Sequence, residues 1–187
     1  EGFPFDTPVV CSYFGMGPAV NGVISERVPG ITLKEVFRKK LLPDQALLKQ
    51  WARALARIHT FEPKHPEVFT KRTKADLLAQ AHVRLKSGLL RPESFSAKYG
   101  GSGTIDLEQE LDEVERSFRA IAFNQVCLNH GDPCAPNFIW SPTRRDVSGC
   151  VDLSGLGFTD LHWDLSIACW SLNYNVKQDV SSLFLAE

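Results

Sequence analysis

The chain has 187 residues, of which 43% are hydrophobic, enough for one well-packed domain or two small ones. Its 21 basic and 22 acidic side chains leave a formal charge of -1, which argues against a nucleic acid or an anionic membrane as partner. The longest apolar runs, residues 9–11 and 120–123, are far shorter than the roughly 20 residues that a membrane span needs.

The N-terminus lacks the basic segment, apolar core and cleavage site of a signal peptide. It also lacks an initiator Met, and we therefore expect the chain to begin inside a longer reading frame. The five cysteines are odd in number and scattered, which favours free thiols in a reducing cytoplasm over a disulfide framework. A zinc site is the alternative, although the spacing of its four candidate ligands matches no usual paired-ligand pattern: Cys127, His130, Cys134 and Cys150.

Two strands are predicted near the beginning of the chain, over residues 8–14 and 20–28, around a turn at residues 15–18. The Gly-x-Gly of this turn is not followed in register by a third glycine, a lysine or a helix start. We therefore interpret it as a turn and not as a phosphate-binding loop.

Three helices are predicted next, over residues 43–60, 74–87 and 106–122. In the first, His59 should pack or cap, and five apolar residues form one face: Leu47, Leu48, Trp51, Leu55 and Ile58. In the third, four apolar residues should face inward: Leu107, Leu111, Val114 and Phe118. Its acidic face should be solvated: Glu108, Glu110, Asp112, Glu113 and Glu115. The glycine-rich stretch 99–103 is predicted to be a loop.

The last part of the chain alternates short strands with turns. A strand is predicted over residues 125–129, and a hairpin is predicted from strands 138–140 and 149–151. A glycine-rich turn and a helix over residues 160–172 follow. Helices combined with short hairpins predict an α+β fold.

Three polar residues stand at the ends of these predicted strands. Asp132 follows the first strand, Asn137 lies just before the hairpin, and Asp152 follows it. Protein kinases arrange a base and two magnesium ligands in this order, as H-R-D-x4-N and then the Asp of D-F-G. The set predicts Asp132 as catalytic base and Asn137 and Asp152 as Mg²⁺ ligands. Turn or capping roles are the alternative, which fits any one of these residues better than the ordered set.

The run HGDPCAPNFI at residues 130–139 resembles the catalytic loop of aminoglycoside phosphotransferases, particularly the streptomycin and kanamycin kinase branches. Residues 152–160 (DLSGLGFTD) resemble the D-L-G-x-L-G-x-A-D segment of that family, and residues 163–165 resemble the helix start that follows it. Upstream, ISERVPG at residues 24–30 resembles the hinge strand, and Ala54-x3-Ile58-His59 resembles the end of the first large helix. The likeness covers most of the chain.

The resemblance implies the C-terminal, mostly helical lobe of a protein-kinase-like fold. Residues 1–30 would be the end of the nucleotide lobe and the hinge, and residues 31–187 would be the helical catalytic and substrate lobe. Asp132 would deprotonate the substrate hydroxyl, while Asn137 and Asp152 would hold Mg²⁺.

The resemblance also implies supporting roles. The Ser25 carbonyl and the Arg27 amide would bind the adenine of ATP (or the base of GTP). His130 and Asp164 would support the catalytic loop. Asp160 and the acidic helix 106–115 are candidate substrate contacts, since aminoglycosides are polycations that carboxylates attract. A solvated helix face is the alternative for the second.

Two departures from the family pattern stand out. Nothing before Pro8 supplies the glycine-rich phosphate cover or the strand lysine of the family. We therefore expect the 187-residue chain alone to show little or no ATP-dependent phosphorylation. Gly155 stands where many relatives carry Arg, which removes one cation on the phosphate side.

The expected activity is phosphorylation of an aminoglycoside hydroxyl by ATP or GTP in the cytoplasm, as in antibiotic resistance. Two alternatives stay open: a kinase of another small alcohol or a sugar, and a non-catalytic fragment of such a kinase. The sequence predicts neither the acceptor hydroxyl nor the oligomeric state.

Overall fold

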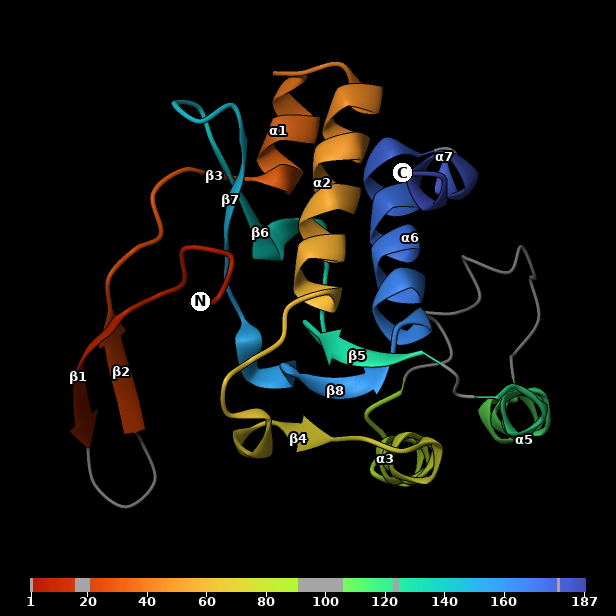
Figure 1. Cartoon of the computed structure of the whole chain (residues 1–187). Coiled ribbons are helices and arrows are strands. Elements are labelled where there is room, and N and C mark those ends of the chain that lie inside the picture. The colour runs from red at the N-terminus through yellow and green to blue at the C-terminus, as the bar shows by residue number, and fades with distance from the viewer. Residues whose placement is uncertain (1, 16–20, 91–105, 123–124, 178) are drawn as a thin grey trace. The chain divides into compact units, whose positions relative to one another are not determined.

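The computed structural model describes residues 2–15, 21–90, 106–122, 125–177 and 179–187 (Figure 1). The predicted loop at residues 99–103 and most of the predicted turn at residues 15–18 lie outside these ranges. The chain divides into two compact units, a larger one (residues 1–70 and 127–187) and a smaller one (residues 71–126). Helices and small sheets make up the described structure, so the prediction of an α+β fold is confirmed.

Four helices surround the core of the larger unit: α1 (Leu33–Lys39), α2 (Asp44–His59), α6 (His162–Val176) and α7 (Ser181–Leu185). Helix α2 contacts α7, and α6 contacts both α1 and α7 (Figure 1). The fully buried Trp51 lies at their centre, with the rings of Phe37, Phe138 and Phe184 at centroid distances of 6.2, 6.2 and 5.6 Å.

The apolar stripe predicted for residues 43–60 is confirmed, because all five of its side chains are buried in α2. Asp44 in the first turn and Arg57 in the last complement the helix macrodipole. Helix α1 was not predicted. It is only seven residues long, and Thr32 caps it by accepting a hydrogen bond from the Glu35 amide at 3.2 Å.

The described strands form three small sheets. Antiparallel β1 (Val10–Gly15) and β2 (Asn21–Ser25) make the predicted N-terminal pair. The second sheet has the order β3-β6-β7, with β3 (Ile31–Thr32), β6 (Phe138–Ser141) and β7 (Asp146–Cys150). The third has the order β4-β8-β5, with β4 (Thr70–Lys71), β8 (Gly157–Asp160) and β5 (Val126–Asn129). The predicted β6–β7 hairpin is confirmed, with Phe138 opposite Cys150.

Among the described residues, three short 3₁₀ turns connect these elements: Pro66–Val68, Ala135–Asn137 and Leu153–Gly155. The last two follow Asp132 and Asp152. Strand β8 occupies part of the segment predicted to be a glycine-rich turn.

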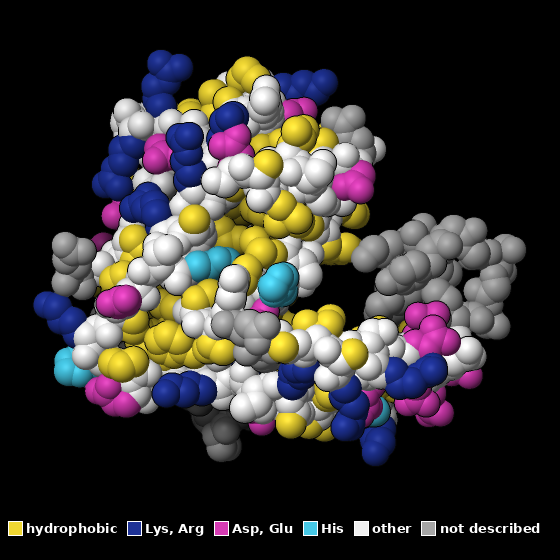
Figure 2. Space-filling view, turned by 45° about the vertical axis from the view of Figure 1, so that its right-hand side comes forward, with side chains coloured by type: hydrophobic (Ala, Val, Ile, Leu, Met, Phe, Trp, Pro, Cys, Tyr) yellow, Lys and Arg dark blue, Asp and Glu magenta, His cyan; other side chains and the backbone are white. Residues whose placement is uncertain are grey.

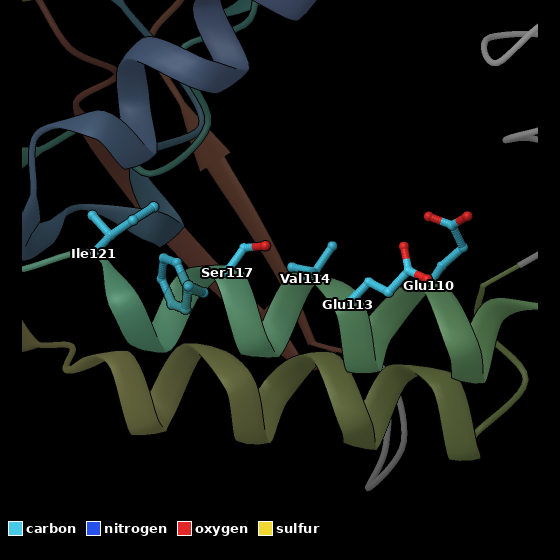
Figure 3. A pocket seen from close by; sticks show the side chains of 6 residues that line it. Glu110, Glu113, Val114, Ser117 and Ile121 are labelled. Carbon is cyan, nitrogen blue, oxygen red and sulfur yellow. The ribbon is translucent and has the colours of Figure 1, made fainter.

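The smaller unit consists mainly of α3 (Lys74–Lys86) and α5 (Leu107–Ala120), which lie side by side (Figure 3). A capping box of Thr73 and Asp76 starts α3, and the Asp106 carboxylate caps α5. Leu77 is the one buried apolar side chain among the described residues of this unit.

Two predictions for α5 are wrong. Val114, predicted to face inward, is 54% exposed. Glu115, predicted to be solvated, is bonded to His82 of α3 at 2.9 Å and to Arg119. The helix turns Glu115 and Phe118 toward α3, where Phe118 meets Lys74. Leu107, Leu111 and Phe118 are half-buried as predicted, so the inward face differs from the prediction only in that Glu115 takes the place of Val114.

Exposed basic side chains gather on α1 and its C-cap: Lys34, Arg38, Lys39 and Lys40. Figure 2 shows Lys and Arg side chains collected at this end of the molecule. Among the described helices, none combines the length and the apolar character that crossing a bilayer requires.

Candidate active site

A tight loop between β5 and β6 carries two of the three predicted site residues. The Asp132 carbonyl accepts the Cys134 amide at 2.8 Å, and the Cys134 carbonyl accepts the Asn137 amide at 2.9 Å. The Asn137 side-chain amide then donates to the Asp132 carboxylate at 3.1 Å and to its carbonyl at 2.9 Å. The loop therefore brings Asp132 and Asn137 side by side.

The hairpin returns the third residue to the same place. The Val151 amide donates to the Asn137 carbonyl at 2.9 Å, and Asp152 is the next residue. Asp152 adopts a left-handed backbone conformation (φ 57°), and one of its carboxylate oxygens accepts the Ser154 hydroxyl at 3.1 Å. The structure thus brings together Asp132, Asn137 and Asp152.

The local charge is negative. The described Lys and Arg side chains form no ion pair with Asp132 or Asp152. Burial, together with a hydrogen bond to Asp132, raises the pKa of the neighbouring Cys134 thiol to about 12, so this thiol stays protonated. Two carboxylates that form no ion pair with the described Lys and Arg side chains suit a bound metal ion.

The donor set fits magnesium better than zinc. Asn137 points its amide nitrogen at Asp132, which leaves its carbonyl oxygen as a ligand, and Asp152 offers a carboxylate oxygen. Mg²⁺ takes one or two protein oxygens and completes its shell with water and phosphate. In the described part of the chain no three His, Cys, Asp or Glu side chains form a metal-binding group, so the zinc alternative at Cys127, His130, Cys134 and Cys150 is wrong.

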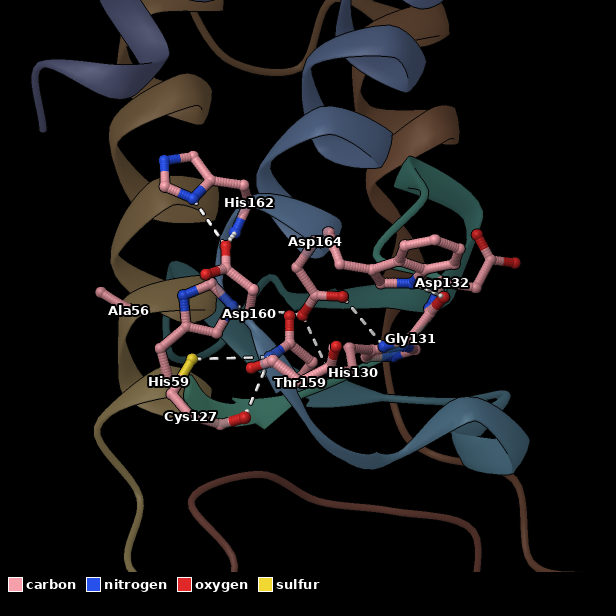
Figure 4. A network of polar contacts seen from close by, with 12 residues as sticks. Ala56, His59, Cys127, His130, Gly131, Asp132, Thr159, Asp160, His162 and Asp164 are labelled. Carbon is pink, nitrogen blue, oxygen red and sulfur yellow. Dashed lines mark hydrogen bonds and ion pairs between the residues drawn. The ribbon is translucent and has the colours of Figure 1, made fainter. Parts of the chain in front are cut away.

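A buried carboxylate anchors the catalytic loop by hydrogen bonds (Figure 4). Asp164 is fully buried in the first turn of α6 and accepts the backbone amides of His130 at 2.7 Å and Gly131 at 2.9 Å. It also accepts a hydrogen bond from His59 Nε2 at 3.2 Å. Burial lowers the pKa of His130 against the opposing effect of Asp164, Asp132 and Asp152.

Gly131 and Gly155 bring the catalytic loop and the Asp152 turn into backbone contact. Gly131 has a φ of +91°, and a Cβ there would lie 2.6 Å from the Gly155 Cα. A side chain at Gly131 would therefore force the two segments apart.

The predicted hinge residues line a pocket of about 270 Å³ in the larger unit. Its walls include Ser25, Arg27, Val28 and Val151, the last being the neighbour of Asp152. The Glu26 amide donates to the Val9 carbonyl at 2.8 Å. Because the peptide bond between Ser25 and Glu26 is trans, the Ser25 carbonyl points away from the side on which the Glu26 amide donates.

Asp160 lies away from the surface. It is 3% exposed, and one of its oxygens accepts the backbone amide of His162 at 3.0 Å and contacts His162 Nδ1 at 2.6 Å (Figure 4).

Exposed carboxylates occur on α5, in the smaller unit. A hollow of about 360 Å³ there is lined by Glu110, Glu113, Val114, Ser117, Phe118 and Ile121 (Figure 3).

Sequence reasoning missed the contacts of His59 and Trp163. His59 was expected to pack or cap, but it bonds to Asp164, which is 105 positions away in the sequence. Trp163 donates its indole N–H to the Gly131 carbonyl at 3.2 Å. No local pattern signals either contact, because each partner lies in a distant part of the chain.

Known proteins resemble this chain in sequence and in fold. A probable aminoglycoside 3'-phosphotransferase from Lactococcus lactis is 33% identical over 73 residues, which are 39% of this chain and 26% of that protein. Streptomycin 3''-kinase from Streptomyces griseus is 48% identical over 42 residues, which are 22% of this chain and 15% of that protein. The matched segments thus span about a quarter or less of these relatives.

The fold is similar to that of aminoglycoside phosphotransferase APH(3'')-Id from Streptomyces rimosus, solved with ADP and streptomycin. The TM-score is 0.78 at 24% identity, covering 98% of this chain and 67% of that one. The predicted protein-kinase-like fold is thereby confirmed. A model of the phosphotransferase enzyme family matches residues 16–183, and the chain therefore belongs to this family.

Proposed function

We propose that this chain carries the catalytic lobe of a kinase that transfers the γ-phosphoryl group of ATP or GTP to a hydroxyl of an aminoglycoside. The observation that carries the proposal is the meeting of Asp132, Asn137 and Asp152 next to the hinge pocket. Phosphoryl transfer needs positioning and charge stabilisation more than covalent chemistry, and these three groups supply both.

The nucleotide base would lie in the pocket beside β2. The Ser25 carbonyl and the Arg27 amide would bind its edge. Val28 and Val151 would pack against its faces, and Val151 leads directly to Asp152, so the phosphates would extend toward that carboxylate. We also propose that residues 1–30 are the end of the nucleotide lobe and the hinge, and that residues 31–187 form the catalytic lobe.

Asn137 and Asp152 would hold Mg²⁺ through their side-chain oxygens. Such an ion would supply positive charge beside the phosphates, which would stabilise the charge that develops during transfer. Asn137 has a second role, because its amide nitrogen fixes the Asp132 carboxylate at the same time. One side chain thus couples the metal site to the base.

Asp132 would orient the acceptor hydroxyl and take its proton as the hydroxyl oxygen bonds to the γ-phosphorus. The bond from that phosphorus to the β,γ-bridging oxygen breaks, and ADP or GDP leaves. The hydrogen bond from Asn137 orients the carboxylate before substrate arrives. His130 and Asp164 would support the loop. The described cysteines are free thiols, as expected for the cytoplasmic location that we propose, where ATP is abundant.

The acceptor class is proposed from chemistry and from relatives. Polycationic aminoglycosides are attracted to carboxylates, and Asp132 and Asp152 have no described cationic partner. An antibiotic-resistance role follows from this acceptor class.

The test is a phosphorylation assay of the full-length gene product with ATP and with GTP. Acceptors are streptomycin, kanamycin, a macrolide, a simple sugar and an amino alcohol, and mass spectrometry detects the phosphorylated product. Asp132→Asn should lower kcat at least about a hundredfold, within the range of a general base, with little change in nucleotide KM. A variant that melts early but turns over normally per folded molecule would remove Asp132 from the mechanism. Product from the sugar or amino alcohol alone would replace the aminoglycoside, and no product from any acceptor would favour a non-catalytic protein.

A further inference from the structure

The peptide group before the proposed base is held at both ends. The Gly131 amide donates to Asp164, and the Gly131 carbonyl accepts the indole N–H of Trp163. Trp163 and Asp164 are consecutive residues in the first turn of α6. Helix α6 therefore holds this peptide group through hydrogen bonds to both its N–H and its C=O group.

A second helix supports this arrangement of hydrogen bonds. His59, at the last position of α2, donates to the same Asp164 oxygen that receives the His130 amide. Its neighbour Ile58 is fully buried, which anchors this end of α2 in the core. The loop is thus tied to two helices that approach it from distant parts of the sequence.

We propose that Trp163 and His59 are positioning residues that fix the direction of Asp132 toward the acceptor hydroxyl. The inference rests on the proposed function, because it concerns the same base. Neither side chain touches the reacting atoms. Each acts through the loop, Trp163 directly at Gly131 and His59 through Asp164.

The conformation of Gly131 explains why the loop requires these hydrogen bonds. Glycine has the widest backbone freedom of all residues, and here it adopts a φ of +91° that few other residues share. Asp132 is the next residue, so a rotation about Gly131 swings its carboxylate. A misplacement of about 1 Å in a reacting group can cost a hundredfold in rate.

Matched variants separate the hydrogen bonds from packing. Trp163→Phe removes the indole N–H and keeps an aromatic ring. Its control is Trp170→Phe, on the exposed side of the same helix, where the ring stacks on Tyr174. His59→Leu removes the donor and His59→Gln keeps one, with His65→Leu as the control at an exposed histidine that pairs with Glu67.

Hydrogen exchange of the 187-residue chain tests whether these hydrogen bonds hold the loop, and it does not require a measurement of enzyme activity. In Trp163→Phe and His59→Leu, the amides of residues 130–132 should exchange at least about tenfold faster, the effect expected for one lost hydrogen bond. His59→Gln, Trp170→Phe and His65→Leu should keep wild-type rates. The amides of α2 should be unchanged in all five variants.

Kinetics of the full-length gene product test whether these hydrogen bonds serve catalysis. The two donor-removing variants should lower kcat at least about tenfold with nucleotide KM unchanged, and His59→Gln should recover most of this loss. Wild-type exchange in both variants, or faster exchange with unchanged kcat, overturns the proposal. So does faster exchange spread over α2, which would indicate general destabilisation. If the wild-type protein phosphorylates no acceptor, the proposed function fails. The exchange result still decides whether the hydrogen bonds of Trp163 and His59 hold the loop.

Discussion

Asp152 combines a strained backbone with a proposed metal-binding side chain. Its φ of 57° is tolerated by Asn better than by most residues, so Asp152→Asn removes the charge without adding strain. We predict that this variant binds Mg²⁺-ADP at least about tenfold more weakly, or 1.4 kcal/mol, because an anionic ligand becomes neutral. The measurement is the rise in melting temperature on adding ADP with and without Mg²⁺.

Asp132→Asn is the matched control for this prediction. Its carboxylate is bonded to Asn137 and is proposed to serve the acceptor hydroxyl, so its loss should leave the magnesium-dependent rise in place. Equal rises in wild type and Asp152→Asn would show that Asp152 is not a metal ligand.

His130 should make the fold sensitive to mild acid. Burial lowers its pKa, so the unfolded chain takes up this proton near pH 6.5 while the folded chain takes it up only at lower pH. The stability that depends on neutral His130 is fully present above about pH 6.5 and is lost as the pH falls toward the folded pKa, by at most about 1.4 kcal/mol per pH unit. His130→Asn should lose less stability than wild type between pH 7.5 and 5.5.

Urea unfolding of both proteins at the two pH values checks this prediction. The other four histidines are present in wild type and variant alike, so their contributions cancel in the difference. A difference in unfolding free energy that does not change with pH would contradict it.

At the scale of elements, the contact between the catalytic loop and the Asp152 turn depends on two glycines. Gly131→Ala should cost about 3 kcal/mol or more, because a left-handed backbone and a steric overlap with Gly155 add together. Gly88→Ala is the control, since Gly88 also has a positive φ (+67°) but has no atom within 4 Å of the added Cβ. It should cost only about 1 kcal/mol.

Thermal unfolding followed by circular dichroism compares the two variants. If Gly131→Ala melts no earlier than Gly88→Ala, the loop and the turn can separate freely, and their close approach is not a structural requirement.

Elements with a strong local pattern were predictable from the sequence. The α2 stripe repeats over about three turns, and the β6–β7 hairpin is bounded by polar residues. Helix α1 was missed because a seven-residue helix shows fewer than two repeats of its period. The face of α5 was misjudged because Val114 and Glu115 are adjacent, and only the position of α3 decides which of them packs.

The candidate site was predictable for a different reason. Asp132, Asn137 and Asp152 belong to one ordered motif within 21 residues, so their order predicts that they meet. The contacts of His59 and Trp163 depend on where α2 and α6 lie relative to the loop. That arrangement is set by core packing around Trp51, which no short pattern encodes.

At the scale of the whole molecule, the two units differ in how much apolar surface they bury. The core of the larger unit joins α1, α2, α6 and α7 around Trp51. In the smaller unit, Leu77 is the one described apolar side chain that is buried, and polar contacts such as His82 with Glu115 hold α3 to α5. Burial of apolar area supplies most folding free energy, and surface ion pairs add little.

We therefore predict that the smaller unit opens far more readily than the larger one. Amides in α3 and α5 should exchange at least about a hundredfold faster than those in α2, because local opening needs little free energy where few apolar contacts break. Hydrogen exchange measured by mass spectrometry on peptides from both units checks this. Leu77→Ala should speed exchange in α3 and α5 and leave α2 unchanged, while Leu55→Ala, at a fully buried site of α2, should speed exchange in α2. Equal exchange rates in α2 and α5 of the wild-type chain would show that both units unfold together as one cooperative structure.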